Sequence, residues 1–301
     1  MGISVKNRAV ILAFRLLASL PHLFVRGIAR FLAAIVWLSG SEMRKVTEVN
    51  LALCYPNMPE AERQQLAKQA VLETVRTVFE MPHAWLSPAQ IALQKIHQVQ
   101  GLEYIEQLRS EGNGVIIILP HMGNWEYIGL YLAQRFPCTS LYKPTKEPEF
   151  NAIVRDARSR TGAELVPTNK KGVLAVVKAL KAGGITCILP DQIPDDKNSM
   201  VFAPFFGEQA ATMTLIPNLL QRGNIKAVCG FAKRREQGGF DIVIQPVDEA
   251  IYSEDTATAA AAMNRSMEQL VALAPAQYQW EYKRFRLGPQ GKRNCYKRQL
   301  I

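Results

Sequence analysis

The chain has 301 residues, of which 48% are hydrophobic and 21% are charged, which is enough to build a sizeable buried core and excludes a disordered or collagen-like protein. Lysine and arginine outnumber aspartate and glutamate by 36 to 26, giving a formal net charge of +10. This charge favours an anionic partner, such as nucleic acid, a membrane surface, a phosphorylated substrate or an acidic protein. The five cysteines form no CxxC pair, so neither a disulfide framework nor a thiolate zinc site is expected, and a reducing compartment fits best.

The amino-terminal forty residues predict a membrane-associated helical segment. Residues 9–38 are strongly apolar, but arginines interrupt them, so no uncharged stretch reaches the ~18 residues of a simple membrane-spanning helix. At helical spacing the polar side chains fall within a stripe of about 80°, formed by Arg8, Arg15, Ser19, His22, Arg26 and Arg30. We expect residues 1–40 to lie in the membrane interface with these arginines toward anionic head groups. A helical hairpin packed on the protein's own core is the alternative, and the arginines argue against a secretory signal.

Residues 41–301 are predicted to form one α/β domain. Two amphipathic helices are expected first, at residues 43–54 and 59–80. Short apolar runs bounded by turn residues then predict strands at 114–120, 138–142, 163–166, 185–189, 225–231 and 240–247. Helical patterns lie at 122–135, 147–160, 170–182, 212–222 and 254–274. This alternation indicates a central, mostly parallel sheet flanked by helices.

The strongest candidate site lies where the predicted strand at 114–120 ends, at His121-Met-Gly-Asn-Trp-Glu126. On one continuous helix, side chains five positions apart point about 140° away from each other, so the two groups can meet only across a turn. Gly123 permits such a turn, and Glu126 would then bind one imidazole nitrogen while the other faces a cleft. This arrangement makes His121 a general base for an alcohol that attacks an acyl carbon. The spacing equally allows a loop histidine and a glutamate that only stabilises the start of the helix.

Other chemistries lack their motifs. HExxH is absent, and His22, His83 and His97 lie elsewhere in the chain, so we expect no metal. Neither a GxSxG elbow nor an equivalent exposed thiol is present, which points to direct transfer without a covalent intermediate. No GxxxxGK[ST] or GxGxxG motif follows a strand, so we expect no nucleotide cofactor, and no cofactor of another kind is predicted.

The HMGNWE segment resembles the HX4D/E signature of the lipid A late acyltransferases, the lauroyl and myristoyl transferase family. Further blocks follow the family's order and spacing: Asn50-Leu51, Cys54-Tyr55-Pro56, Arg158-Ser-Arg160-Thr-Gly162, Leu189-Pro-Asp191-Gln192, Pro204-Phe-Phe206-Gly207 and Gln279-Trp280-x2-Lys283-Arg284-Phe285. The resemblance covers nearly the whole chain. It implies a glycerolipid-acyltransferase-like fold at the cytoplasmic face of a bacterial inner membrane. The implied reaction moves a long saturated acyl group from acyl carrier protein to the hydroxyl of a hydroxyacyl chain on a lipid A precursor.

The same resemblance implies roles for individual residues. His121 is implied as the general base, and Glu126 as the group that orients it. Asn124 and Trp125 would shape the site, Arg158 and Arg160 would bind substrate phosphate or the oxyanion, and Asp191 and Gln192 would lie in the active site. The alternatives are solvated helix-end cations for the two arginines and ordinary turn residues for Asp191 and Gln192.

The carboxyl-terminal segment is basic. No acidic residue follows Glu281, whereas the basic ones are Lys283, Arg284, Arg286, Lys292, Arg293, Lys297 and Arg298. Together with the amino-terminal arginines, we expect them to face anionic lipid, the phosphates of a lipid A precursor or acyl carrier protein. Two further functions stay open: an acyltransferase that uses acyl-CoA and another glycolipid or phospholipid, and a membrane-tethered protein that binds nucleic acid.

Overall fold

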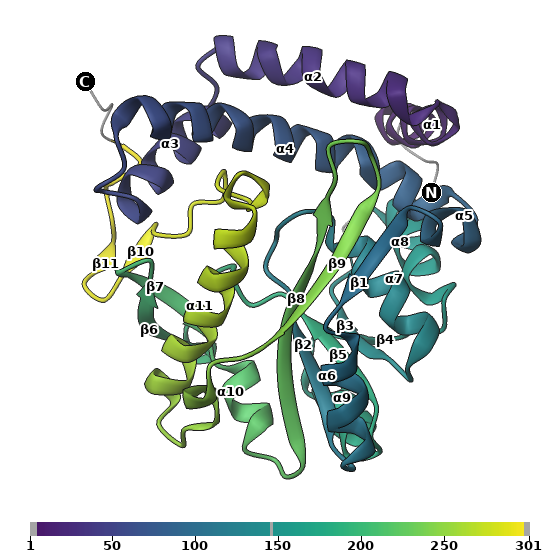
Figure 1. Ribbon diagram of the computed structural model, residues 1–301, viewed down its shortest axis with the longest axis vertical. Coiled ribbons are helices and arrows are strands. Elements are labelled where there is room, and N and C mark those ends of the chain that lie inside the picture. The colour runs from purple at the N-terminus through teal and green to yellow at the C-terminus, as the bar shows by residue number, and fades with distance from the viewer. Residues whose placement is uncertain (1–4, 145–146, 298–301) are drawn as a thin grey trace.

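A five-stranded sheet forms the centre of the protein (Figure 1). The computed structural model describes residues 5–144 and 147–297, with the side chains of residues 5–10 and 22 outside the described part. The strand order is β1 (Ile96–Gln100), β9 (Phe240–Pro246), β8 (Ile225–Arg234), β2 (Gly114–Ile118) and β5 (Ile185–Ile188). Neighbouring strands are parallel except for β8 and β9. The predicted mostly parallel central sheet is therefore confirmed.

Strand β2 is buried on both faces. Alternate side chains of a strand point to opposite faces, so Ile116 and Ile118 enter one hydrophobic core while Val115 and Ile117 enter the other. All four are fully buried, as expected of a β-branched central strand in a parallel sheet. This packing fixes the end of β2, which is the point where His121 follows.

Helices cover both faces of the sheet. On one face lie α9 (Lys170–Lys181), α10 (Leu215–Leu220) and α11 (Thr256–Leu273). The other face carries α6 (Leu102–Ser110) and α7 (Trp125–Arg135). Helix α11 packs against β8, as predicted for the last helix.

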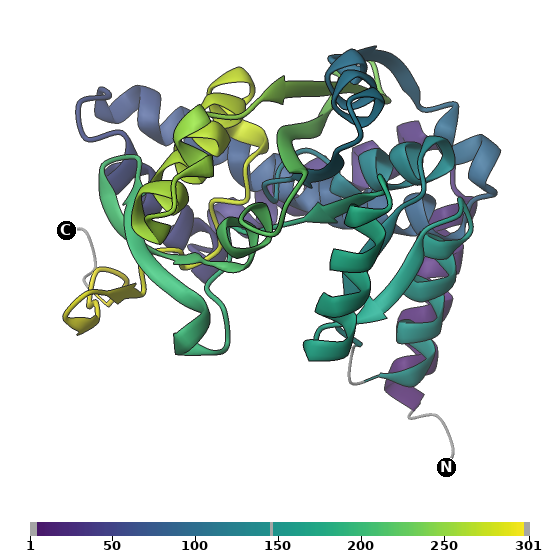
Figure 2. The same cartoon turned by 90° about the horizontal axis from the view of Figure 1, so that it is seen from below.

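Smaller strand pairs flank the central sheet. The parallel pair β3 (Thr139–Tyr142) and β4 (Glu164–Pro167) lies beside α8 (Pro148–Ser159) at one end of the molecule. The antiparallel hairpin β6 (Met200–Phe205) and β7 (Glu208–Met213) lies at the other end, with the short pair β10 (Leu287–Gly288) and β11 (Gly291–Lys292) (Figure 2). Short 3-10 turns occur at Lys197–Ser199, Glu249–Tyr252 and Pro275–Gln277.

Two parts of the secondary-structure prediction are wrong. The helix predicted at 212–222 begins only at Leu215, because residues 208–213 pair with β6 as a hairpin. Its two-residue turn consists of Phe206 and Gly207, both with positive φ, which matches the turn type that hairpins favour. Strand β1, helices α5 and α6, and the hairpin strands β6 and β7 are also absent from the prediction.

The amino-terminal helices pack on one long helix. Helices α1 (Val5–Ser19) and α2 (His22–Leu38) both lie against α4 (Glu60–Leu86), next to α3 (Glu42–Cys54), and α5 (Ala89–Leu93) follows α4 (Figure 1). On α2, Val25, Ala29 and Ala33 are buried toward α4. The boundary that we predicted at residue 40 falls in the turn between α2 and α3.

The outer face of these helices is apolar. Large exposed side chains on α1 and α2 include Leu12, Leu16, Leu23, Phe24, Phe31 and Leu38. Among the described residues no single helix is long and apolar enough to cross a membrane. Within this described part of the chain, one helix pair, Leu23–Leu38 and Glu42–Cys54, has the length and composition to cross a membrane together, but it is bent by 77°.

The arginine stripe departs from its predicted direction at one position. Arg26 donates to the backbone carbonyl of Glu236 in the β8–β9 loop, so it faces the protein rather than a head group. The side chains of Arg8 and His22 lie outside the described residues, whereas Arg15, Ser19 and Arg30 are exposed. On α2 the polar stripe therefore borders the side that packs on the protein, and the outermost face is apolar.

Candidate active site

The loop that carries His121 is held on both sides by backbone pairing. Met122 forms an antiparallel bridge with Tyr278, and Gly123 forms a parallel bridge with Ala232 of β8. Gly123 has a φ of +59°, and a Cβ there would lie 2.0 Å from the carbonyl oxygen of Ala232. Both conditions require glycine. The turn predicted at Gly123 is present and places His121 at the carboxyl end of β2.

His121 is oriented by Asp191, which follows the neighbouring strand β5. The imidazole Nδ1 lies 2.6 Å from Asp191 Oδ1, and the backbone N–H of His121 donates to Oδ2 over 2.8 Å. Burial opposes the charge of Asp191, but the imidazole and both hydrogen bonds from His121 outweigh it and hold the pKa of this carboxyl below its usual value. A charged Asp191 accepts a hydrogen bond from Nδ1–H, so the proton stays on Nδ1 and Nε2 is the basic nitrogen of the ring.

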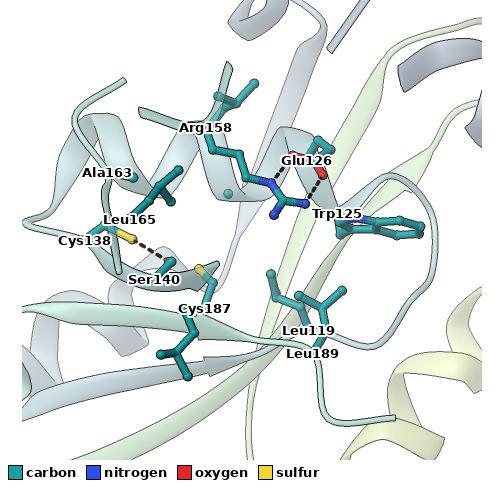
Figure 3. A pocket seen from close by; sticks show the side chains of 13 residues that line it. Leu119, Trp125, Glu126, Cys138, Ser140, Arg158, Ala163, Leu165, Cys187 and Leu189 are labelled. Carbon is teal, nitrogen blue, oxygen red and sulfur yellow. Dashed lines mark hydrogen bonds and ion pairs between the residues drawn. The ribbon is translucent and has the colours of Figure 1, made fainter. Parts of the chain in front are cut away.

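Glu126 does not orient the imidazole. Its carboxylate forms a two-point ion pair with Arg158 of α8, with oxygen to nitrogen distances of 2.6 and 3.0 Å (Figure 3). The expected hydrogen bond between Glu126 and His121 is therefore not formed. The turn at Gly123 instead brings Trp125 beside the imidazole, with the two ring centroids 5.0 Å apart. Glu126, one residue later in the first turn of α7, points away toward α8.

Glu126 stabilises the charge of Arg158. Glu126 itself is 4% exposed, and burial opposes the charge of Arg158. The carboxylate of Glu126 outweighs this effect and raises the pKa of the guanidinium. The pair thus places a fixed positive charge, partly open to solvent, at a cavity rim beside Trp125.

Two cavities lie next to Trp125. We call the first the leucine cavity: it has a volume of about 90 Å³ and lies between α7 and strands β3 to β5. Its apolar lining includes Leu119, Leu130, Leu141, Leu165 and Leu189, with Glu126 and Arg158 also on its wall (Figure 3). The second, which we call the α4 cavity, measures about 190 Å³ and is lined by His121, Trp125, residues of α4, Gln277 and Gln279. Trp125 lines both cavities and contacts the imidazole of His121, which lines the α4 cavity but not the leucine cavity.

The remaining predicted site residues separate into two groups. Gln192 lies near the site, with its amide nitrogen 3.5 Å from Gln279 Oε1. Asn124 is fully buried and caps α7 by accepting from the backbone N–H of Glu126. Arg160 donates to the backbone carbonyls of Ala84 and Trp85 at the end of α4, over 2.6 and 2.7 Å. Asn124 and Arg160 therefore hold helices in place, and neither lines the two cavities.

The sequence prediction missed a buried ionic cluster behind the His121 loop. Arg234 of β8 pairs with Glu73 and Glu80 of α4 and donates to Thr77 Oγ1, which in turn donates to the carbonyl of Gly123 over 2.9 Å. Burial opposes the charge of Arg234, but the two glutamates outweigh it and raise its pKa. The helical spacing of Glu73, Thr77 and Glu80 on one face of α4 was the available signal.

Three of the basic residues in the carboxyl-terminal segment are buried or paired with acidic residues, whereas Arg286, Lys292 and Lys297 are exposed. Arg284 is 2% exposed and donates to Thr212 Oγ1 inside the core. Arg293 pairs with Glu208 over 2.8 Å, and Lys283 pairs with Glu42 over 2.5 Å. Sequence charge does not report burial or pairing with distant acidic residues, and Arg298 lies outside the described residues.

Comparison with known proteins supports the resemblance found in the ordered sequence blocks. The chain matches the model of the bacterial lipid A biosynthesis acyltransferases over residues 5–287. It is 27% identical over 254 residues to the lipid A biosynthesis lauroyltransferase of Escherichia coli (strain K12), covering 84% of this chain and 82% of that protein. The palmitoleoyltransferase of the same organism is 26% identical over 253 residues, covering 83% of this chain and 81% of the relative. The corresponding figures for its myristoyltransferase are 26% over 267 residues, 86% and 80%. This chain belongs to the bacterial lipid A biosynthesis acyltransferase family.

Proposed function

We propose that this protein transfers a long saturated acyl group from acyl carrier protein to the hydroxyl of a hydroxyacyl chain on a lipid A precursor. The observation that carries the proposal is the His121–Asp191 pair, whose imidazole contacts Trp125 on the wall of an apolar cavity, in a chain of this family. The relatives are named for the transfer of lauroyl, palmitoleoyl and myristoyl groups, which supports a long acyl group.

His121 acts as the general base in the proposed reaction. Its Nε2 takes the proton of the acceptor hydroxyl while that oxygen attacks the thioester carbonyl of the donor. Asp191 holds the ring by Nδ1 and stabilises the imidazolium that forms. The carbon to sulfur bond then breaks, the new ester remains, and the imidazolium returns its proton to the thiolate of the carrier. No covalent bond to the protein forms at any step.

Glu126 acts through Arg158. By binding two of its nitrogens, Glu126 fixes the plane of the guanidinium at the wall of the leucine cavity. Such a planar, permanently charged group suits a substrate phosphate or the negative charge that develops on the thioester oxygen. We therefore assign Arg158 to substrate binding and Glu126 to positioning it, in place of the direct assistance to His121 expected from the sequence.

The two cavities suit the two acyl chains of the reaction. The donor chain arrives on a water-soluble carrier and gains the most from a closed apolar cavity, so we assign it to the leucine cavity. The acceptor is a membrane lipid, and the α4 cavity is lined by the helix on which α1 and α2 pack. We assign the acceptor hydroxyl to this side of His121.

The apolar outer face of α1 and α2 supports docking to the cytoplasmic face of the inner membrane. Leu23, Phe31 and Leu38 are 77%, 67% and 81% exposed, and a row of large exposed apolar side chains marks an interaction surface. We propose that this face enters the interface, with Arg15 and Arg30 beside anionic head groups. Replacing Leu23 and Phe31 by serine should reduce sedimentation with anionic vesicles, whereas unchanged sedimentation would contradict the docking face.

Acyl transfer by the purified protein tests the proposed function. The protein is mixed with a lipid A precursor and with acyl carrier protein that carries a labelled acyl group. The mass of the product is then measured by mass spectrometry. We expect added acyl chains, and about 10²- to 10⁴-fold less product with His121→Ala. The matched control is His97→Ala, since His97 is an exposed histidine on β1. Two parallel reactions replace the donor with acyl-CoA or the acceptor with a phospholipid.

Each of these reactions tests a different part of the proposed function. Transfer only from acyl-CoA, or only to the phospholipid, would replace the proposed donor or acceptor. An active His121→Ala variant would remove the proposed base. In cells, an unchanged number of acyl chains on lipid A after deletion of the gene would contradict the assignment.

A further inference from the structure

Gly129 has no backbone reason to be glycine. It lies in the interior of α7, where glycine disfavours the helix more than any residue except proline. It is not among the glycines with positive φ, and a Cβ placed on it would meet no atom within 4 Å. Any of the good helix formers would therefore fit the backbone at this position. What distinguishes glycine here is the space that it leaves.

That space belongs to the leucine cavity. Gly129 lines this cavity together with Trp125, Glu126 and Leu130, which lie on one face of α7 by helical spacing. Leucines and Cys187 of the sheet strands form the facing wall. Gly129 is one helical turn, about 6 Å, beyond Trp125, and Trp125 contacts the imidazole of His121. An acyl chain that runs from His121 past Trp125 along α7 would therefore meet the cavity wall at Gly129.

We propose that Gly129 determines the length of the acyl chain that the protein accepts. With glycine at this position, the wall of α7 leaves room for the chain to continue toward β3 and β4. A larger side chain would project into the cavity and stop a long chain, while a shorter chain would still bind. The inference rests on the proposed function, because the occupant of the cavity is taken to be the donor acyl chain.

Competition between donors tests this inference. Wild-type protein, Gly129→Ala and Gly129→Met each receive an equimolar mixture of saturated acyl donors that differ by successive pairs of carbon atoms. Each methylene that is no longer buried weakens binding about fourfold. We therefore expect Gly129→Met to shift the product ratio toward shorter chains by about tenfold or more for each pair of excluded carbons. Gly129→Ala should shift it less, in the same direction.

Two further variants make the result specific. Gln134→Met introduces the same side chain at an exposed position of the same helix and should keep the wild-type product ratio. Leu165→Ala enlarges the cavity near β4 and should shift the ratio toward longer chains. Because alanine favours a helix over glycine, Gly129→Ala keeps the test valid even if the methionine variant fails to fold.

The outcomes separate this inference from the proposed function. If the wild type transfers no acyl group from any donor, the proposed function fails. If the wild type is active but Gly129→Ala, Gly129→Met and Leu165→Ala lower turnover equally for all chain lengths, the proposed function stands and the role of Gly129 is refuted. A shift to shorter chains in both glycine variants, absent in Gln134→Met, supports it.

Discussion

Asp191 and Glu126 are two buried carboxylates near the same loop, and they bind different partners, an imidazole and a guanidinium. Asp191 follows β5, 70 residues away from His121 in the chain, and accepts a hydrogen bond from its imidazole. Glu126 is only five residues from His121, yet it binds Arg158 of α8. Strands β2 and β5 are adjacent and parallel, so their carboxyl ends meet at one edge. Proximity at the edge of the sheet, rather than proximity in sequence, selects the partner of the histidine.

The two partners also differ in what they can do during a reaction. An imidazole gains and loses a proton near neutral pH, whereas a guanidinium stays charged. Asp191 therefore stabilises a charge that appears only when His121 takes a proton. Glu126 maintains a charge that is present throughout. Substituting Asp191 should affect turnover, and substituting Glu126 should affect substrate binding.

Asp191→Asn should have the largest effect. The amide cannot select the Nδ1 tautomer or stabilise the imidazolium, so we expect kcat to fall about 10³- to 10⁴-fold with KM little changed. Steady-state kinetics at saturating acceptor measure both constants. The double variant with His121→Ala should be no slower than His121→Ala alone, because the two groups act as a unit. Near-normal turnover of Asp191→Asn would mean that the contact with His121 has no role in catalysis.

Glu126→Gln should have a smaller effect, about ten- to hundredfold, comparable with the loss of other groups that orient a ligand-binding side chain. The loss should appear mainly in KM, since Arg158 keeps its charge but loses its fixed plane. A double-mutant cycle with Arg158→Gln checks this relation. If Glu126 acts through Arg158, the double variant is as impaired as Arg158→Gln alone. Fully additive losses would instead indicate an independent role for Glu126.

The sequence predicted the position of the site better than its contacts. The β-branched run before Pro120 identified a buried strand, and Gly123 identified the turn that places His121 at its end. The contact with Asp191 depends on β5 lying beside β2, and no local pattern specifies strand order. The block containing Asp191 drew attention to this residue only through the family resemblance and its position after a strand.

Burial of charged residues was the other feature that the sequence did not reveal. Arg284 and Arg234 look like surface cations in a basic chain, yet both are buried and paired or hydrogen-bonded. Arg26 likewise binds the β8–β9 loop instead of pointing outward. Each contact joins segments far apart in the chain, so it follows from the tertiary arrangement and not from composition or helical periodicity.

The smallest expected effect concerns stability, and its pH dependence distinguishes Asp191 from a carboxyl without such a partner. Asp191→Asn removes hydrogen bonds to a charged group, so we expect a loss of about 2 kcal/mol in the free energy of unfolding at neutral pH. The folded state lowers the pKa of Asp191. Its stabilising contribution is therefore present above the unfolded value of about 3.9 and is lost as pH falls through the still lower folded value.

Urea unfolding in detergent, at pH values from neutral to acidic, measures the free energy of unfolding of both proteins. The difference in this free energy between wild type and Asp191→Asn should become smaller as the pH falls. Glu281 provides a control of opposite sign, because burial raises its pKa. Its contribution is complete below the unfolded value of about 4.3 and is lost as pH rises through the folded value. Glu281→Gln should therefore gain stability relative to wild type as pH rises. If the Asp191→Asn gap instead widened toward acid, the carboxylate would not be held in its charged form by His121, and the proposed tautomer would be wrong.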